Sequence, residues 1–120
     1  MQVRERADFI ILYFSKNEDI IAEINKVVRE YMITEAKVTG SGYLNRLEYG
    51  ILAESDPIFF KKFLVEKLLT VTNFQGRILE RELSLMINAV DSENIYHSGK
   101  VFSTNTENDL IMTMQVLRTE

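Results

Sequence analysis

The chain contains no cysteine, one proline and one histidine in 120 residues. Without cysteine it can form neither a disulfide framework nor a thiolate metal site, and this suits a cytoplasmic protein. One histidine, His97, cannot hold a metal ion alone within one chain. We therefore expect no cofactor and no metal, and a cytoplasmic location.

The chain also lacks a basic excess and a long apolar run. Its formal net charge is -4, which argues against a nucleic-acid binder that works by bulk charge but leaves room for a local basic patch. The longest apolar run, Phe9 to Phe14, is too short to cross a bilayer. Arg4 and Arg6 precede this run, but Ser15 to Asp19 is charged where a signal peptide would need a cleavage site. We expect neither a membrane segment nor a signal peptide.

The length and the 46% share of hydrophobic residues fit one domain with a sizeable core. No linker, repeat or low-complexity stretch interrupts residues 1–120. We therefore expect a single domain over 1–120.

The N-terminal part predicts a strand followed by a helix. Met1 to Ala7 is charged and is expected to be an exposed lead-in, and Phe9 to Phe14 reads as a strand buried on both faces. Ser15 and Glu18 have the spacing of a capping box. Apolar residues then recur at three- and four-residue steps, which predicts an amphipathic helix from about Glu18 to Met32.

A glycine pair follows the helix. Ala36 to Thr39 reads as a short strand, and Gly40 and Gly42 predict a tight bend before the next strand. Their open amides could also face an anion or another subunit. Without a third glycine in register and a following helix, the pair is not a dinucleotide-binding fingerprint.

The rest of the chain reads almost wholly as strands. The segment Phe59 to Leu68 fits a helix or a pair of short strands, and its aromatic residues favour strands. Gly76 is expected to begin a turn or bulge. Leu83 to Val90 alternates cleanly, with Leu83, Leu85, Ile87 and Ala89 on one face. The other expected strands are 47–52, 69–75, 95–102 (broken at Ser98 and Gly99) and 110–117, with a loop over 103–109.

One helix and six or seven mostly antiparallel strands predict an α+β domain. The strands carry more apolar residues than one helix can cover, which favours self-association.

The helix followed by ITEAKVTGSGYLNRLEYG resembles the signature of the PPC domain family ("plants and prokaryotes conserved", also called DUF296). The resemblance covers roughly residues 8 to 117 and rests on Thr39, Gly40, Gly42, Leu44 and Gly50. It implies a PPC-like fold, a homotrimer and an association with DNA. The plant relatives bind AT-rich minor groove through a separate Arg-Gly-Arg-Pro hook, which this chain lacks.

The resemblance also bears on metal binding, because family members often carry a His-x-His strand and a third histidine after the next turn. Here Ser84 and Met86 stand at the first two positions, and His97 matches the third. Two of the three ligands are missing, which argues against a metal. Met86 is more simply a packing residue, and His97 a polar residue near a strand end.

No catalytic constellation is evident. Ser41 lies between glycines but not in a nucleophile elbow, and no second histidine can serve as its base. The carboxylates are scattered, with Glu48 the least easily dismissed acid or base. We expect a non-enzymatic protein.

Three functions remain open. The first is DNA binding through a basic patch interleaved with Phe59, Phe60 and Phe63, although the phenylalanines could instead pack inside. Its candidate residues are Lys61, Lys62, Lys67, Arg77 and Arg81. The second is a small-ligand pocket at a subunit interface, built from Gly40, Ser41, Gly42, Asn88 and His97. The third is an oligomerisation scaffold that acts through a protein partner and leaves an exposed apolar patch.

Overall fold

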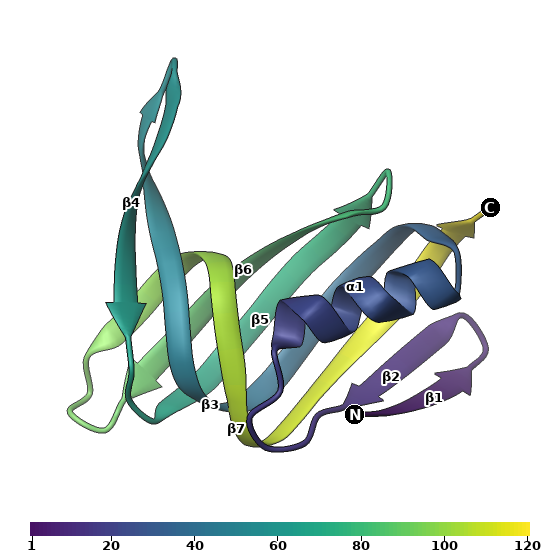
Figure 1. The fold of residues 1–120 in the computed structure, drawn as a ribbon, viewed down its shortest axis with the longest axis horizontal. Coiled ribbons are helices and arrows are strands. Elements are labelled where there is room, and N and C mark those ends of the chain that lie inside the picture. Colours follow the sequence, from purple (N-terminus) through teal and green to yellow (C-terminus); the bar gives the residue numbers. More distant parts are fainter.

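The computed structural model describes residues 1–120 as one highly twisted antiparallel sheet with one helix packed on it (Figure 1). The elements are β1 (Gln2–Arg6), β2 (Phe9–Tyr13), α1 (Ile20–Glu30), β3 (Ile33–Ser55), β4 (Ile58–Val65), β5 (Leu69–Leu79), β6 (Glu82–Asp91) and β7 (Tyr96–Thr119). The predicted α+β class with six or seven antiparallel strands and one main helix is confirmed.

Two long strands organise the sheet. The strand order is β1-β2-β7-β6-β5-β3-β4, and β3 also pairs with β7 over most of its length. One edge of β3 is shared by β5 and then β4, while β7 runs along the other. Since β5 pairs with β6 and β6 with β7, the pairings β3-β5-β6-β7 close into a ring. This closure leaves few open edges.

The predicted bend at Gly40 and Gly42 is wrong, because β3 continues through it. The register of β3 shifts between Gly40 and Gly42 against β5, and between Ser41 and Tyr43 against β7. A bulge of this kind lets a long strand coil without ending it. Gly42 takes φ +148, and a Cβ there would lie 2.5 Å from Leu110 Cα.

The predicted break at Ser98 and Gly99 and the loop over 103–109 are also wrong, because both lie inside β7. The polar segment forms a strand because alternate threonines point into the core and find partners. Thr104 Oγ1 donates to the Arg46 carbonyl at 2.7 Å, and Thr106 Oγ1 donates to the Ser15 carbonyl. Buried hydroxyls that are satisfied in this way do not prevent burial.

Most of the N-terminal lead-in, Met1 to Ala7, is exposed as expected, but Gln2–Arg6 within it forms a strand. β1 pairs antiparallel with β2 over its full length. β2 is not buried on both faces: Ile10 and Leu12 are buried, whereas Phe9 is exposed. Only one face of this hairpin meets the core.

The helix is shorter than the expected Glu18 to Met32. Asp19 is the N-cap, and its side chain accepts a hydrogen bond from the Ala22 amide at 3.1 Å. Glu18 instead accepts from the Ser15 amide, so the capping-box pair closes the loop before the helix. The buried helix residues are Ile20, Ile24, Val27 and Val28.

The middle of the chain forms strands where strands were expected. Phe59 to Leu68 contributes one strand, β4, and the alternation over Leu83 to Val90 is that of β6. Gly76 does not begin a turn, because β5 runs on to Leu79. A Cβ at Gly76 would lie 2.5 Å from the Ser84 carbonyl oxygen, so glycine permits close approach of β5 and β6.

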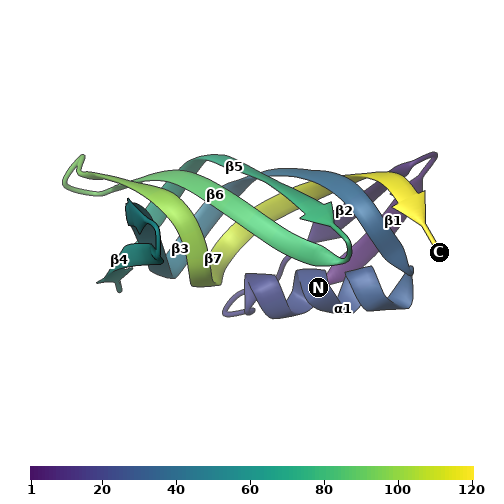
Figure 2. The ribbon, with the colours of Figure 1, turned by 90° about the horizontal axis from the view of Figure 1, so that it is seen from above.

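The helix covers one face of the sheet and leaves the other uncovered (Figure 2). We call the uncovered face the outer face; its residues alternate with buried ones such as Val38, Ile78 and Leu85. The end of β3 from Ile51 and the strand β4 rise from the sheet as a two-stranded arm (Figure 1). The helix is too short to cross a membrane, and no other helix is present.

Candidate functional site

His97 takes part in a chain of polar contacts at the β6–β7 end of the sheet. Its Nε2 lies 3.1 Å from Asp91 Oδ2, and its Nδ1 lies 3.2 Å from the Tyr49 hydroxyl. The pKa of Tyr49 is raised by burial, so its hydroxyl keeps its proton. A neutral imidazole satisfies both contacts if Tyr49 donates to Nδ1 and Nε2–H donates to Asp91.

Asp91 fixes one end of this series of polar contacts. Its Oδ1 accepts from the amides of Glu93 and Ile95 at 2.8 and 3.1 Å. The hydrogen bond from His97, followed by that from the Ile95 amide, lowers the pKa of the Asp91 carboxyl. Asp91 therefore stays ionised and holds the turn before β7 in place. Sequence reasoning missed Tyr49 because β3 brings it to the site from far away in the chain. It also missed Asp91, although Asp91 lies only six residues before His97 and the two face each other across one turn.

The predicted ligand-pocket residues do not share one surface of a single subunit. Ala89 is the register partner of His97, so His97 points toward the core, whereas Asn88 points to the outer face. Asn88 Oδ1 accepts from the Ser98 hydroxyl at 2.6 Å. Ser41 is exposed at the bulge, between Gly40 and Gly42. A pocket formed with a second subunit remains a prediction.

The residues at the expected metal positions do not fit a metal ion. Ser84 and Met86 lie on the outer face, while His97 faces inward and is engaged with Asp91 and Tyr49. No group of three or more histidine or carboxylate side chains is placed to hold a metal. The donor set offers one imidazole that is already hydrogen-bonded.

The predicted basic residues separate within one subunit. Lys67 pairs with Glu93 at 3.5 Å, and Arg81 pairs with Glu120. Arg77 lies on β5 opposite Lys37. Lys61 and Lys62 occupy opposite faces of β4, on the arm, and the β5–β6 turn that carries Arg81 lies at the other side of the sheet (Figure 1).

The structure instead brings Lys62 together with three residues into what we call the Lys–Phe cluster: Phe60, Lys62, Lys100 and Phe102. Lys62 Nζ lies 4.3 Å from the centre of the Phe102 ring, and Lys100 Nζ lies 5.2 Å from that of Phe60. The two rings meet edge to face at 5.3 Å. These are cation–π distances. The matching alternations Phe60-x-Lys62 and Lys100-x-Phe102 are the sequence signal that could have found this cluster.

The backbone beneath the cluster explains its geometry. Gly50 is the register partner of both Lys62 on β4 and Lys100 on β7. A Cβ at Gly50 would lie 2.6 Å from Phe102 Cε2, so the Phe102 ring rests against the glycine. The cluster thus presents two ammonium groups and two aromatic rings on one side of the arm's base.

The arm itself is unusually apolar for an exposed hairpin. Ile58 is 72% exposed and Phe59 is 57% exposed. Ile51, Leu52 and Leu64 are also exposed on the arm. An exposed apolar patch of this kind is typical of an interaction surface.

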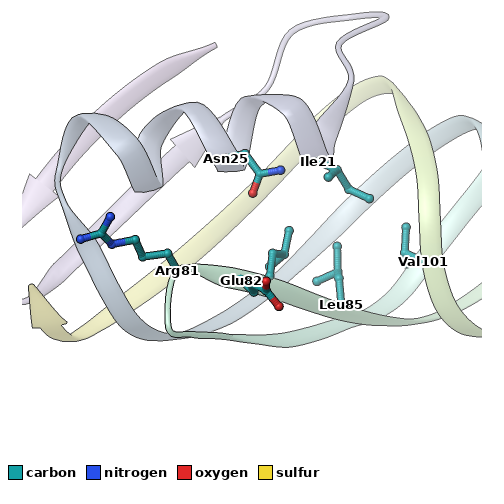
Figure 3. Close-up of a pocket in the computed structure, with 7 residues that line it drawn as sticks. Ile21, Asn25, Arg81, Glu82, Leu85 and Val101 are labelled. Atoms are coloured by element: carbon teal, nitrogen blue, oxygen red, sulfur yellow. The ribbon is translucent and has the colours of Figure 1, made fainter.

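A cavity of about 360 Å³ lies between the helix and β6 (Figure 3). Ile21 and Asn25 line it from the helix, and Glu82 and Leu85 line it from β6. Arg81 extends away from the labelled side chains of β6 (Figure 3). The cavity gathers no convergent set of charged groups.

The fold is that of a known class of small α+β proteins. A "putative DNA-binding protein" of Bacteroides thetaiotaomicron has a TM-score of 0.90 at 13% identity, over 99% of this chain and 85% of that chain. A protein of the same description from Ralstonia eutropha JMP134 has a TM-score of 0.85 at 11% identity, over 98% and 83%.

A plant- and prokaryote-conserved (PPC) protein of Pyrococcus horikoshii has a TM-score of 0.81 at 13% identity, over 99% of this chain and 83% of that chain. No protein-family model matches the sequence, and no curated protein matches it. The chain therefore has a PPC-like fold, as the resemblance implied.

Proposed function

We propose that this chain is a non-enzymatic, homotrimeric PPC-like protein that binds DNA through the Lys–Phe cluster. The observation that carries the proposal is the arrangement of Lys62 and Lys100 over Phe60 and Phe102 at the base of the arm. Two proteins of the same fold carry DNA binding in their names, which supports it. We also propose a cytoplasmic location, which a chain without cysteine suits.

The cluster offers two kinds of contact to DNA. The ammonium groups neutralise backbone phosphates, which makes the affinity depend on salt. The rings provide an apolar surface against sugars or unstacked bases. A trimer would present three such clusters, so a weak contact in each subunit would add up to a useful affinity.

The test is fluorescence anisotropy with labelled AT-rich and GC-rich duplexes over a range of salt concentrations. We expect the double variant Lys62→Gln/Lys100→Gln to bind more weakly and to flatten the plot of log affinity against log salt by about 0.9 for each lysine that contacts a phosphate. The matched control is Lys26→Gln/Arg29→Gln, which removes the same charge from exposed helix positions. Equal losses in the two double variants, or no binding by the wild type at low salt, would refute the proposal.

Self-association is proposed to use the apolar arm. Its exposed residues would lose contact with water against another subunit, at roughly 25 cal/mol for each Å² buried. We expect Ile58→Ser/Phe59→Ser to shift the mass measured by light scattering from trimer toward monomer. Ile95→Ser, which removes a half-exposed isoleucine from the β6–β7 turn, should leave the mass unchanged. A monomeric wild type would reject the trimer while leaving DNA binding to be judged by anisotropy.

A further inference from the structure

Lys37 and Arg77 form a pair of like charges on the outer face. They are direct register partners on β3 and β5, and both are exposed. They line a concavity of about 560 Å³ together with Thr39, Gln75 and Ser84. The floor is formed in part by Gly76 and Val38, and Met86 lies at its β6 side.

Neither cation has a partner within the protein. No carboxylate lies within ion-pair distance of Lys37 or Arg77, neither side chain makes a hydrogen bond, and neither lies over an aromatic ring. Each of the other basic residues of β3, β4 and β5 has a partner within the protein. Arg46 donates to the Ser103 hydroxyl at 2.7 Å, and Lys61 and Lys62 lie over phenylalanine rings.

This arrangement costs stability as it stands, because like charges directly opposite each other in an antiparallel sheet repel. Glu35 and Glu82 lie two residues further along their strands, both opposite Leu79. Neither forms an ion pair with Lys37 or Arg77. A bound anion would relieve the repulsion.

The neutral groups around the two cations are hydrogen-bond donors without protein partners. The hydroxyls of Thr39 and Ser84 and the amide of Gln75 make no side-chain hydrogen bond. A guanidinium fork matches two oxygens of an anion, and an ammonium group adds a compact charge beside it. Two charges and three neutral donors suit an anion with several oxygens and more than one negative charge.

We propose that Lys37 and Arg77 form the centre of a binding site for a phosphoryl group, with Thr39, Gln75 and Ser84 as additional donors. The site is separate from the Lys–Phe cluster and does not depend on the proposed DNA binding. The phosphoryl group can come from free phosphate, a mononucleotide or a nucleic-acid backbone. Met86 at the edge of the site is the register partner of Lys100, so a long phosphate polymer could reach both surfaces.

The test follows backbone amide shifts in nitrogen-15 NMR spectra while inorganic phosphate, and separately a mononucleotide, is titrated at constant ionic strength. We expect shifts centred on Lys37, Gly76, Arg77 and Ser84. The variant Lys37→Gln/Arg77→Gln should weaken binding on the order of tenfold or more, while Lys26→Gln/Arg29→Gln should leave it unchanged. Chloride in place of phosphate should give no localised shifts.

The variant Lys37→Glu separates loss of phosphate binding from loss of folding. It turns the like-charge pair into an opposite-charge pair, so it should melt no lower than the wild type and yet lose phosphate binding. Wild-type protein should melt at a higher temperature in phosphate than in chloride, and the variant should not.

A parallel titration with duplex DNA distinguishes the possible sources of the phosphoryl group. If only duplex DNA binds, and Lys37→Gln/Arg77→Gln weakens it and flattens its salt dependence, the group is a backbone phosphate. If free phosphate binds to the wild type and to Lys62→Gln/Lys100→Gln alike, the site stands even where DNA binding fails. If Lys37→Gln/Arg77→Gln binds phosphate, the mononucleotide and DNA as the wild type does, the site does not exist.

Discussion

His97 and Asp91 join the two ends of the β6–β7 turn through a contact of 3.1 Å between Nε2 and Oδ2. Asp91 ends β6, His97 lies at the start of β7, and the Tyr49 hydroxyl approaches the same imidazole from β3. The β6–β7 hairpin and the strand β3, which is remote from it in sequence, therefore meet through one chain of polar contacts, whose contribution to stability can be measured.

Asp91→Asn should lower the unfolding midpoint at neutral pH, because the amide cannot replace a carboxylate that accepts three hydrogen bonds. The pKa of Asp91 is lowered in the folded protein, chiefly by the hydrogen bond from His97. Its stabilisation is therefore present above the ordinary carboxyl pKa of 3.8 and is lost as pH falls through the lower folded-state value.

Urea unfolding at a series of pH values from about 7 to about 2.5 checks this. The difference in the free energy of unfolding between the wild type and Asp91→Asn should disappear at the lowest pH values. The exposed Glu66→Gln serves as the control and should follow the wild type throughout. If the difference in unfolding free energy is the same at all pH values, the charge of Asp91 does not stabilise the turn.

Gly42→Ala should destabilise the fold by more than about 1 kcal/mol. The new Cβ would meet Leu110 Cα at 2.5 Å and the Asp109 carbonyl oxygen at 2.6 Å, at a φ that side chains rarely adopt. Thermal or urea unfolding measures the loss. Ser41→Ala, at the exposed neighbouring position, should stay within about 0.5 kcal/mol of the wild type; if the two variants behave alike, the bulge tolerates a side chain.

Gly50→Ala should leave the protein folded but displace the Phe102 ring, whose Cε2 would lie 2.6 Å from the new Cβ. Because the lysines remain, DNA affinity should fall by about two- to fivefold with an unchanged salt slope. Anisotropy titrations at two salt concentrations distinguish this from loss of a phosphate contact. An unchanged affinity would show that the rings do not contact DNA.

Asp19→Ala should cost about 1 kcal/mol, because it removes the side-chain acceptor for the Ala22 amide at the start of the helix. Asp19→Ser keeps an acceptor there and should restore most of the loss. Chemical unfolding of both variants gives the comparison, and equal stability of Asp19→Ala and wild type would contradict the assignment of this cap.

The sequence predicted the helix, the strand type of nearly every segment and the fold class, because those follow from local apolar periodicity. It failed where long-range pairing overrides local signals. Gly40 and Gly42 look like a turn, yet β7 and β5 hold them within one strand. Residues 103–109 look like a loop, yet the buried hydroxyls of Thr104 and Thr106 donate to the backbone carbonyls of Arg46 and Ser15.

The two candidate binding surfaces were also only partly predictable from the sequence. Lys62 and its neighbouring phenylalanines were visible in the sequence, but Lys100 and Phe102 join them only through the β3–β7 ladder. Likewise, Arg77 was recognised as basic, whereas its partner Lys37 becomes apparent only from the β3–β5 register. Spacing along the chain cannot reveal which strands will be neighbours.

The ladder between β3 and β7 also governs when the sheet can form. Its first partners are Ile33 and Thr119, and its last are Gly50 and Lys100. During synthesis, β3 leaves the ribosome long before β7 and must wait with one edge open until β7 arrives. Closing contacts between such distant segments is slow. The interval before closure is therefore the stage at which the open edge of β3 favours aggregation.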